Sequence, residues 1–296
     1  MLDTCGEFLL NSNFFKEYEM AIGISNAFVQ LFDAEVKQAY QGARALAGVT
    51  RERTNVEGNQ VKFPKIGKGT ATVRVPQTDV TPLNVTYSQV TATMTDFIAA
   101  EYSDIFNQQK VNFDERRELV SVVGASIGRR MDQLVIDALN AASSPSTVAT
   151  SIGGAGTNLN LAKLLAAKKA LDTKNVPSEG RCMIIHANGL ASLLDEQELT
   201  SSDFASVKAL VQGEIDTFLG FKFISIGDRD EGGLPLPSTR TSFAFHRDAI
   251  GMGIGMNQRS EINYIAEKTS FLVSSMFSAG AIAIDDEGIV KISSTE

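Results

Sequence analysis

The feature that most constrains this chain is an alternating stretch at residues 58–75 that has mainly polar sequence around it. Apolar and polar residues alternate there with a period of two, which predicts two half-exposed strands joined by a turn at residues 64–69. A two-stranded ribbon is marginally stable at best in water. Because little nearby would bury its apolar face, we expect a second copy of the chain to stabilise it. The residues expected on that face are Val61, Phe63, Ala71, Val73 and Val75.

A longer strand and a long helix are expected to follow the ribbon. Residues 85–100 alternate again, and a capping box of Asn112 and Glu115 predicts the start of a helix over residues 113–142. That helix would be roughly 45 Å long. One side of the expected strand carries Val90, Ala92, Met94 and Ile98.

Helical spacing predicts an apolar stripe and an opposite polar side on this helix. The stripe comprises Leu119, Val122, Val123, Ile127, Met131, Leu134, Val135 and Ala138. The opposite side comprises Glu118, Ser121, Ala125, Arg129, Asp132 and Gln133. Gly124 and Gly128 share one side, and each costs about 1 kcal/mol relative to Ala in a helix. We therefore expect a sheet or strand to approach closely there.

Composition excludes several classes of protein. A length of 296 residues fits one large domain or two ordinary ones, and a net charge of −8 argues against a basic nucleic-acid-binding protein. Two cysteines, Cys5 and Cys182, indicate no disulfide framework and a reducing compartment. Neither a secretory signal nor an apolar run of membrane-spanning length is visible, so we expect a soluble cytoplasmic product with no membrane partner.

The rest of the chain alternates between predicted helices and strands, which indicates a compact α/β layer after a small-residue linker at residues 143–156. Residues 1–20 are expected to form an extended N-terminal arm, and residues 227–241 a loop. Helices are expected at residues 26–46, 159–171 (with Lys163, Lys168 and Lys169 outward), 189–199 and 202–212. Strands are expected at residues 181–186, 218–226, 243–256, 261–266 and 271–284.

No group of residues indicates catalysis or metal binding. We expect His186 and His246 to be structural, because a four-ligand zinc site would need further partners. A nucleophile pair of Cys182 and His186 rests only on the presence of both residues. The glycine-rich residues 251–255 and 67–70 fail the P-loop pattern, so turns and close strand packing are expected.

Two acidic groups fall in predicted loops. Residues 228–231 and 285–287 could each bind a cation loosely, but neither has the spacing of an EF-hand. We interpret both as solvated loop charge. The sequence thus predicts no catalytic residues, no cofactor, no metal and no enzymatic activity.

Basic residues gather on the ribbon and on the long helix. Given the acidic net charge, we expect these residues to contact another subunit rather than nucleic acid. The expected intersubunit residues are Lys62, Phe63, Lys65, Lys68, Arg74, Arg116, Arg117, Arg129 and Arg130.

Over nearly its whole length, this order of elements resembles the tailed-phage major capsid proteins of the HK97 fold. The resemblance lies in element order and length: an N-terminal arm, a long hairpin called the E-loop, a spine helix, an α/β domain and two returning strands. The local pieces that carry it are Val61-Lys-Phe-Pro-Lys-Ile, Phe113 to Ala142, Glu261-Ile-Asn-Tyr-Ile and Ala281 to Val290.

The resemblance implies an α+β fold with four regions. The N-terminal arm and first helix would occupy residues 1–53, and the E-loop residues 54–85. A peripheral domain with the spine helix would comprise residues 86–145 and 259–284. An α/β axial domain would comprise residues 146–258 and 285–296.

The resemblance also implies a function and partners. Pentamers and hexamers would close an icosahedral shell around double-stranded DNA, so the protein would reside in the virion after assembly in the bacterial cytoplasm. The expected partners are further copies, a portal protein, DNA bound without sequence specificity, and in some shells a decoration protein. Because the chain begins almost directly with the arm, we expect a separate scaffolding protein, as in short-tailed phages of the T7 type.

Some members of that family cross-link their subunits through an E-loop lysine. Lys65 and Lys68 match that lysine by position, but no matching asparagine or catalytic carboxylate is identified. We therefore predict no covalent cross-links.

Two alternatives remain open from sequence. One is an encapsulin-like nanocompartment, which would keep the fold but enclose protein, and which nucleic acid in purified particles would distinguish. The other is a cytosolic α/β enzyme with a site near Cys182, His186 and residues 227–241, which would form a monomer or small oligomer.

Overall fold

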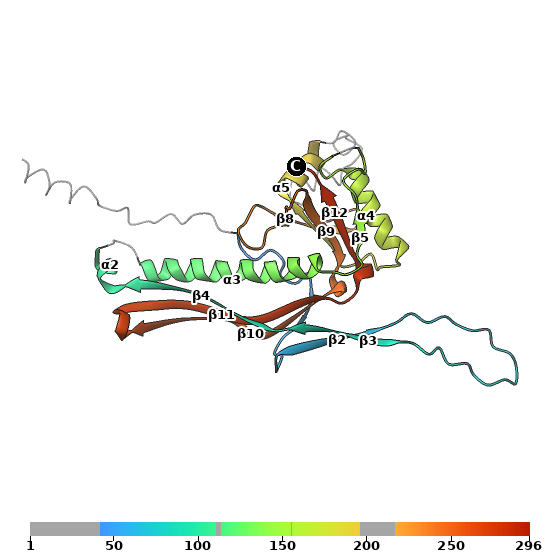
Figure 1. Ribbon diagram of the computed structural model, residues 1–296, viewed down its shortest axis with the longest axis horizontal. Helices are drawn as coiled ribbons and strands as arrows, with labels where there is room; N and C mark the ends of the chain where they lie inside the picture. Colours follow the sequence, from blue (N-terminus) through green and yellow to red (C-terminus); the bar gives the residue numbers. More distant parts are fainter. Residues whose placement is uncertain (1–41, 111–113, 155, 196–216) are drawn as a thin grey trace, which may run out of the picture.

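The computed structural model describes residues 42–110, 114–154, 156–195 and 217–296. Figure 1 shows a long sheet beneath helix α3 (Glu115–Asn140), a second sheet with helices α4 and α5, and a two-stranded ribbon that projects beyond both. The expected N-terminal arm, most of the expected first helix and the expected helix at residues 202–212 lie outside the described residues. The described end of that first helix, residues 42–46, is not helical.

The long sheet has four strands in the order β1-β10-β11-β4. Its centre is an antiparallel hairpin of β10 (Ile250–Ile265) and β11 (Ser270–Ala283), joined by the short helix η2 (Ala266–Lys268). Strand β4 (Thr95–Asp104) forms one edge, and β1 (Arg51–Arg53) pairs with the other side of β10. Two register shifts interrupt β10, between Ile254 and Met256 and between Met256 and Arg259.

Strand β10 differs from its expected bounds. The strands predicted at residues 243–256 and 261–266 are β9 (Arg240–His246) and β10, which the short helix η1 (Arg247–Ala249) separates. The domain boundary expected at residue 258 lies inside β10. One strand therefore runs continuously through the place where the sequence suggested a division.

Helix α3 covers one face of the long sheet and is about 39 Å long. Its buried residues include Val123, Ile127, Met131, Val135 and Ala138 of the predicted stripe, together with Ile136 and Leu139. The predicted capping box is wrong, because Glu115 is the first helical residue and its carboxylate accepts a hydrogen bond from Ser103. Asn112 lies outside the described residues.

The predicted outward position of Asp132 is also wrong. Asp132 is fully buried, because residues 42–46 lie across this part of the helix. The prediction of a close approach is correct at Gly128, where an added Cβ would lie 3.2 Å from the Cβ of Arg44. The approaching segment is irregular rather than a strand.

The second sheet has six strands in the order β5-β12-β9-β6-β8-β7 and mixes parallel and antiparallel pairs. One face packs on the C-terminal half of α3, and the other on α4 and α5. The predicted strand at residues 218–226 is two strands, since Leu219 and Gly220 form a turn with positive φ. The strands not yet given are β5 (Ser146–Val148), β6 (Arg181–His186), β7 (Thr217–Phe218), β8 (Phe221–Ile226) and β12 (Ile289–Ser294).

Two helices cover the outer face of this sheet: α4 (Leu161–Thr173) and α5 (Ala187–Asp195). The expectation that Lys163 points outward is wrong. Its side chain is fully buried, and its Nζ donates to the carbonyls of Thr157 and Asn158. Burial lowers the pKa of this lysine.

The ribbon pairs different strands from those predicted. Strand β2 (Gln60–Ile66) pairs with β3 (Tyr87–Thr93), and residues 67–86 form no strand. Residues 69–75 alternate in sequence but are all exposed, whereas β3 places Ala92 beside Val61 in a small core. Burial thus selects the later strand, and Pro64, expected in the turn, lies within β2.

The single strand expected at residues 85–100 is interrupted at Met94. Ala92, at the end of β3, and Met94 are buried in the small core with Val61 and Phe63. After Met94, the residues that pack toward α3 are Phe97 and Ala99. Ile98, predicted on the same side as Ala92, is exposed. The chain changes its pairing partner from β2 to β11 at this point, so the alternation shifts by one residue. Helix α2 (Ile105–Lys110) follows β4 at the far end of the long sheet.

Candidate intersubunit surfaces

The loop formed by residues 67–86 carries the most exposed apolar side chains of the described chain. Every residue from 68 to 84 is exposed, and Val73 and Val80 retain 93% and 91% of their accessible surface. Figure 1 shows that the loop extends away from both sheets. A cluster of exposed apolar residues on a soluble protein marks an interaction surface. The large apolar residues exposed on or beside the loop are Ile66, Val73, Val75, Val80, Leu83 and Tyr87.

The root of the ribbon, in contrast, packs on its own subunit. Phe63 is only 1% exposed and lies against β10, where an added Cβ on Gly251 would come 2.8 Å from its ring. An added Cβ on Gly253 would come still closer to Val61, at 2.5 Å from its Cγ1. The glycine-rich residues 251–255 thus permit close strand packing, as expected. Phe63 was predicted to contact another subunit, but its own subunit already covers its ring.

Two of the predicted intersubunit lysines are paired within the chain. The Nζ of Lys65 lies 2.8 Å from Oδ1 of Asp285, and the Nζ of Lys68 lies 2.5 Å from Oε2 of Glu287. Residues 285–287, here called the acidic turn, were expected to be solvated loop charge. The sequence signal that was missed is that the lysines at 65 and 68 and the carboxylates at 285 and 287 have a similar spacing, although they are far apart in the chain. Lys62 and Arg74 are exposed, as an intersubunit role requires.

The helix arginines have mixed environments. Arg116 lies over the ring of Phe271 and Arg130 over the ring of Phe97, each 4.7 Å from the ring centroid. These cation–π contacts join α3 to the long sheet of the same subunit. Arg117 is exposed on the helix surface, and Arg129 lines a depression described below.

The long sheet leaves a second group of apolar residues exposed, which the sequence did not single out. They lie on β4, α2 and β10, and all but Ile98, which is near the start of β4, lie toward the end of the sheet farthest from the ribbon. The alternation signal could not find them, because one exposed face of a sheet has the same period as a buried one. These residues are Ile98, Tyr102, Phe106, Ile262 and Tyr264.

Asp132 joins the start of the described chain to α3. Its two carboxylate oxygens accept hydrogen bonds from the backbone N–H groups of Ala45 and Leu46 at 2.7 and 3.0 Å, and Arg229 lies 3.4 Å away. Burial raises the pKa of Asp132, while the two N–H donors and Arg229 act in the opposite direction. Asp132 therefore fixes where residues 42–46 cross the helix.

Cys182 and His186 do not form a nucleophile–base pair. Both lie on β6, four residues apart on one face, so their Cα atoms are separated by about 13 Å with Ile184 between them. Cys182 is buried, and burial raises the pKa of its thiol. Within the described residues, no cluster of three or more His, Cys, Asp or Glu side chains is arranged to hold a metal ion.

His186, itself buried, instead belongs to a polar network with the end of the chain. Its Nδ1 lies 3.0 Å from Glu296, and its Nε2 lies 3.3 Å from Asp228. Arg240 donates two hydrogen bonds of 2.8 Å to Glu296 and one of 3.0 Å to Asp228. These bonds raise the pKa of Arg240, and the bond from Arg240 lowers the pKa of Glu296. The network holds the C-terminal residues on the second sheet.

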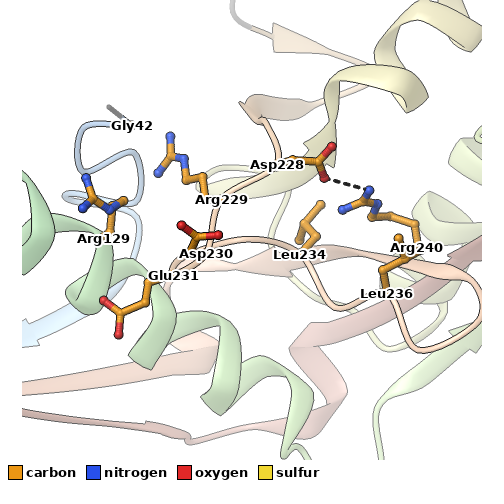
Figure 2. Close-up of a pocket in the computed structure, with 9 residues that line it drawn as sticks. All are labelled: Gly42, Arg129, Asp228, Arg229, Asp230, Glu231, Leu234, Leu236 and Arg240. Carbon is orange, nitrogen blue, oxygen red and sulfur yellow. Dashed lines mark hydrogen bonds and ion pairs between the residues drawn. The ribbon is translucent and has the colours of Figure 1, made fainter. Parts of the chain in front are cut away.

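A depression of about 740 Å³ lies between α3 and residues 228–240. Figure 2 draws the side chains that line it. Two of its arginines are already paired: Arg240 with Asp228, drawn as a dashed line, and Arg229 with Asp132. A site for an anionic ligand would need guanidinium groups that are not already paired with carboxylates. We therefore assign no ligand to the depression. Its lining residues are Gly42, Arg129, Asp228, Arg229, Asp230, Glu231, Leu234, Leu236 and Arg240.

The family model described as phage capsid protein matches residues 24–296, which is most of the chain. A search of curated proteins returned no match. Among the described residues, no helix is long and apolar enough to span a membrane.

Solved structures with a similar fold come from several phage capsids. The capsid structure of the cyanophage P-SCSP1u is 16% identical and has a TM-score of 0.73, with 92% of this chain and 94% of that chain covered. The head structure of Helicobacter pylori bacteriophage KHP40 is 11% identical, with a TM-score of 0.72 and coverage of 89% and 95%. The capsid of H. pylori bacteriophage KHP30 is also 11% identical, with a TM-score of 0.71 and coverage of 98% and 99%. At these identities the likeness shows the fold alone, and it confirms the expected α+β class with an HK97-like arrangement.

Proposed function

Since this chain belongs to the phage capsid protein family, whose members form the virion shell, we propose that it is a major capsid subunit. In this proposal its copies assemble as pentamers and hexamers into an icosahedral shell that encloses double-stranded DNA. Contact between copies is the only activity required of the subunit, and the loop at residues 67–86 provides it.

The observation that carries this proposal is the exposure of the loop. Val73, Val75, Val80 and Leu83 lie in one segment that packs on neither sheet. Burying a valine side chain is worth about 1.5 kcal/mol or more, so leaving several exposed favours a partner that covers them. A second copy of the chain supplies such a surface. Lys62 in β2 and Arg74 in the loop are accessible cations of the ribbon, and Arg117 is an accessible cation near the start of α3.

We extend the proposal to the arrangement of domains. The long sheet with α3 would be the peripheral domain, and the six-stranded sheet with α4 and α5 the axial domain. The division of the strands into two sheets supports this assignment, and so does the core that the second sheet forms with α4 on its outer face; the core between α3 and the second sheet is shared by both regions. The loop would reach neighbouring copies.

The remaining partners follow from enclosing a genome. The proposal includes a separate scaffolding protein, a portal protein and, in some shells, a decoration protein. The packaged DNA would be held without sequence specificity. The acidic net charge supports enclosure without tight binding, because a strongly basic inner surface would bind the DNA tightly.

Replacing residues 69–84 with a short Gly-Ser linker tests the proposal. Gly67 and Thr86 stay, so the hydrogen bond that closes the ribbon is kept. We expect a soluble, folded subunit, because the removed residues are exposed, but no shells by sedimentation or negative-stain microscopy. The unaltered chain, expressed in parallel, is the control.

Normal shells from the linker variant would contradict the proposal. The contents of control particles test the part that concerns DNA, through their buoyant density and ultraviolet absorbance ratio. Particles that contain protein cargo and no nucleic acid would replace the viral function with that of an encapsulin-like compartment.

A further inference from the structure

The ribbon leaves the body of the subunit at one well-defined point. The outermost backbone hydrogen bond between its two limbs runs from the N–H of Gly67 to the carbonyl of Thr86, at 2.8 Å. Beyond this bond no strand pairing continues, and residues 68–84 are all exposed. Lys65 and Lys68 lie on either side of Gly67. Any contact made by these two lysines therefore acts where the loop begins.

Both lysines bind the acidic turn. Lys65 pairs with Asp285 at 2.8 Å, and Lys68 pairs with Glu287 at 2.5 Å. The turn contains the short helix η3 (Asp286–Gly288), which connects β11 of the long sheet to β12 of the second sheet. In Figure 1 this connection lies beside the ribbon where it passes the second sheet.

The acidic turn is itself held firmly. Asp285 accepts a hydrogen bond from the N–H of Glu287, and its own N–H lies 3.3 Å from the carbonyl of Ala249. Asp286 accepts from the N–H of Ser144, just after α3, at 3.0 Å. These bonds connect the turn to both sheets and to the end of α3. The turn is therefore a fixed support for the two lysines.

We propose that the Lys65–Asp285 and Lys68–Glu287 pairs form an ionic latch that sets the direction of the loop before a second copy binds it. This inference rests on the proposed function, in which that loop joins subunits. The four residues are positioning residues: they act on assembly through the loop they orient. Two pairs at separate points restrain both the bending of the ribbon relative to the subunit and its rotation about its own axis. A single pair would leave one of these motions free.

The latch restrains a part of the ribbon that lies beyond its buried root. The residues of the ribbon in the small core are Val61, Phe63 and Ala92, whereas farther out Ile66 and Tyr87 are 64% and 80% exposed. A two-stranded ribbon without such contacts is only marginally ordered. The latch restrains the loop at a position where packing no longer does.

The exposure of the pairs makes the latch reversible. The side chain of Lys68 is 77% exposed, so salt screens its attraction to Glu287. Their hydrogen bond raises the pKa of Lys68 and lowers the pKa of Glu287, so both groups are charged at neutral pH. Added salt, rather than a pH change near neutrality, is therefore expected to open the latch.

Charge reversal tests the latch. Lys68→Glu and Glu287→Lys should each slow shell assembly by roughly two- to fivefold at low salt, as expected for loss of an exposed ion pair. The double variant Lys68→Glu/Glu287→Lys should restore the rate, measured by light scattering. Added salt should reduce the difference between single variants and unaltered chain.

Hydrogen exchange on unassembled subunits supplies a readout that requires no assembly. Each single variant should increase amide exchange at Gly67, because the ribbon opens where the latch is lost. Arg74→Glu is the matched control: it reverses a charge on the same loop away from the latch, and should leave exchange at Gly67 unchanged.

A mixture of the two single variants shows whether the pairs form within or between copies. Pairs within one copy remain broken in the mixture, so assembly stays slow. Restored assembly on mixing would place the pairs between copies and overturn the latch, as would single variants that assemble at the normal rate. These outcomes are independent of the linker variant, whose normal assembly would instead overturn the proposed function.

Discussion

Asp132 is the residue for which sequence periodicity and structure disagree most directly. By helical spacing it belongs to the polar side of α3, yet it is fully buried beneath residues 42–46. A carboxylate that accepts two backbone N–H groups satisfies donors that an irregular segment would otherwise leave unpaired. The spacing of apolar residues predicts which side of a helix packs on a sheet. It cannot predict that a second segment, here residues 42–46, crosses the opposite side.

We predict that Asp132→Ala destabilises the subunit by about 1–3 kcal/mol, because two buried N–H groups and Arg229 lose their acceptor. Asp137→Ala is the matched control on the same helix, since Asp137 is exposed; it should change stability by less than about 0.5 kcal/mol. Urea unfolding of unassembled subunits measures both. Equal effects of the two substitutions would contradict the role given to Asp132.

Asp132 should also produce a pH dependence. Burial raises its pKa in the folded chain above the value in the unfolded chain. Its contribution to stability is therefore greatest below the unfolded pKa and declines as pH rises through the folded pKa. The alanine variant should lack this decline, which repeated unfolding experiments at several acidic pH values would show.

At the scale of elements, the ribbon has two parts with opposite requirements. Its root, with Val61 and Phe63, packs on the glycines of β10, and its loop packs on neither sheet. The alternation in the sequence is the same in both parts. Which part is buried depends on β10, nearly two hundred residues away in the chain, so the pairing of β2 with β3 could not be read from local pattern.

We predict opposite consequences for two substitutions in the ribbon. Phe63→Ala should cost about 3–5 kcal/mol of subunit stability, because it removes a buried ring. Val73→Ala should leave subunit stability within about 0.5 kcal/mol but weaken assembly, because Val73 is exposed in the loop. Unfolding of free subunits and sedimentation of assembly reactions separate the two effects. A stable Phe63→Ala subunit would refute the assignment of the root.

Much of the element order was predictable from the sequence. The long helix, the buried strand β6 and the returning strand β11 have strong local patterns and lie near their predicted positions. The candidate intersubunit residues were less predictable. Phe63, Lys65 and Lys68 contact their own subunit, because tertiary packing and long-range charge pairing decide whether a ribbon residue is free.

At the scale of the whole molecule, the paired lysines bear on covalent cross-linking. Lys65 and Lys68 each pair with a carboxylate of their own subunit. We predict that mature particles show one band near 31.8 kDa on denaturing gels. A ladder of larger covalent species would contradict this prediction, and mass spectrometry of its cross-linked peptides would identify the lysine.

A single strand, β10, runs from the core beneath the second sheet into the long hairpin. The two halves of the subunit therefore cannot pivot on a flexible tether. A copy placed at a sharper corner of a closed surface has to bend the strand itself, and the register shifts between Ile254 and Arg259 are where its ladder is already broken. Residues 254–259 would therefore be the place where the subunit bends. Substitutions that stiffen this segment should restrict the range of particle sizes that copies of the chain can form.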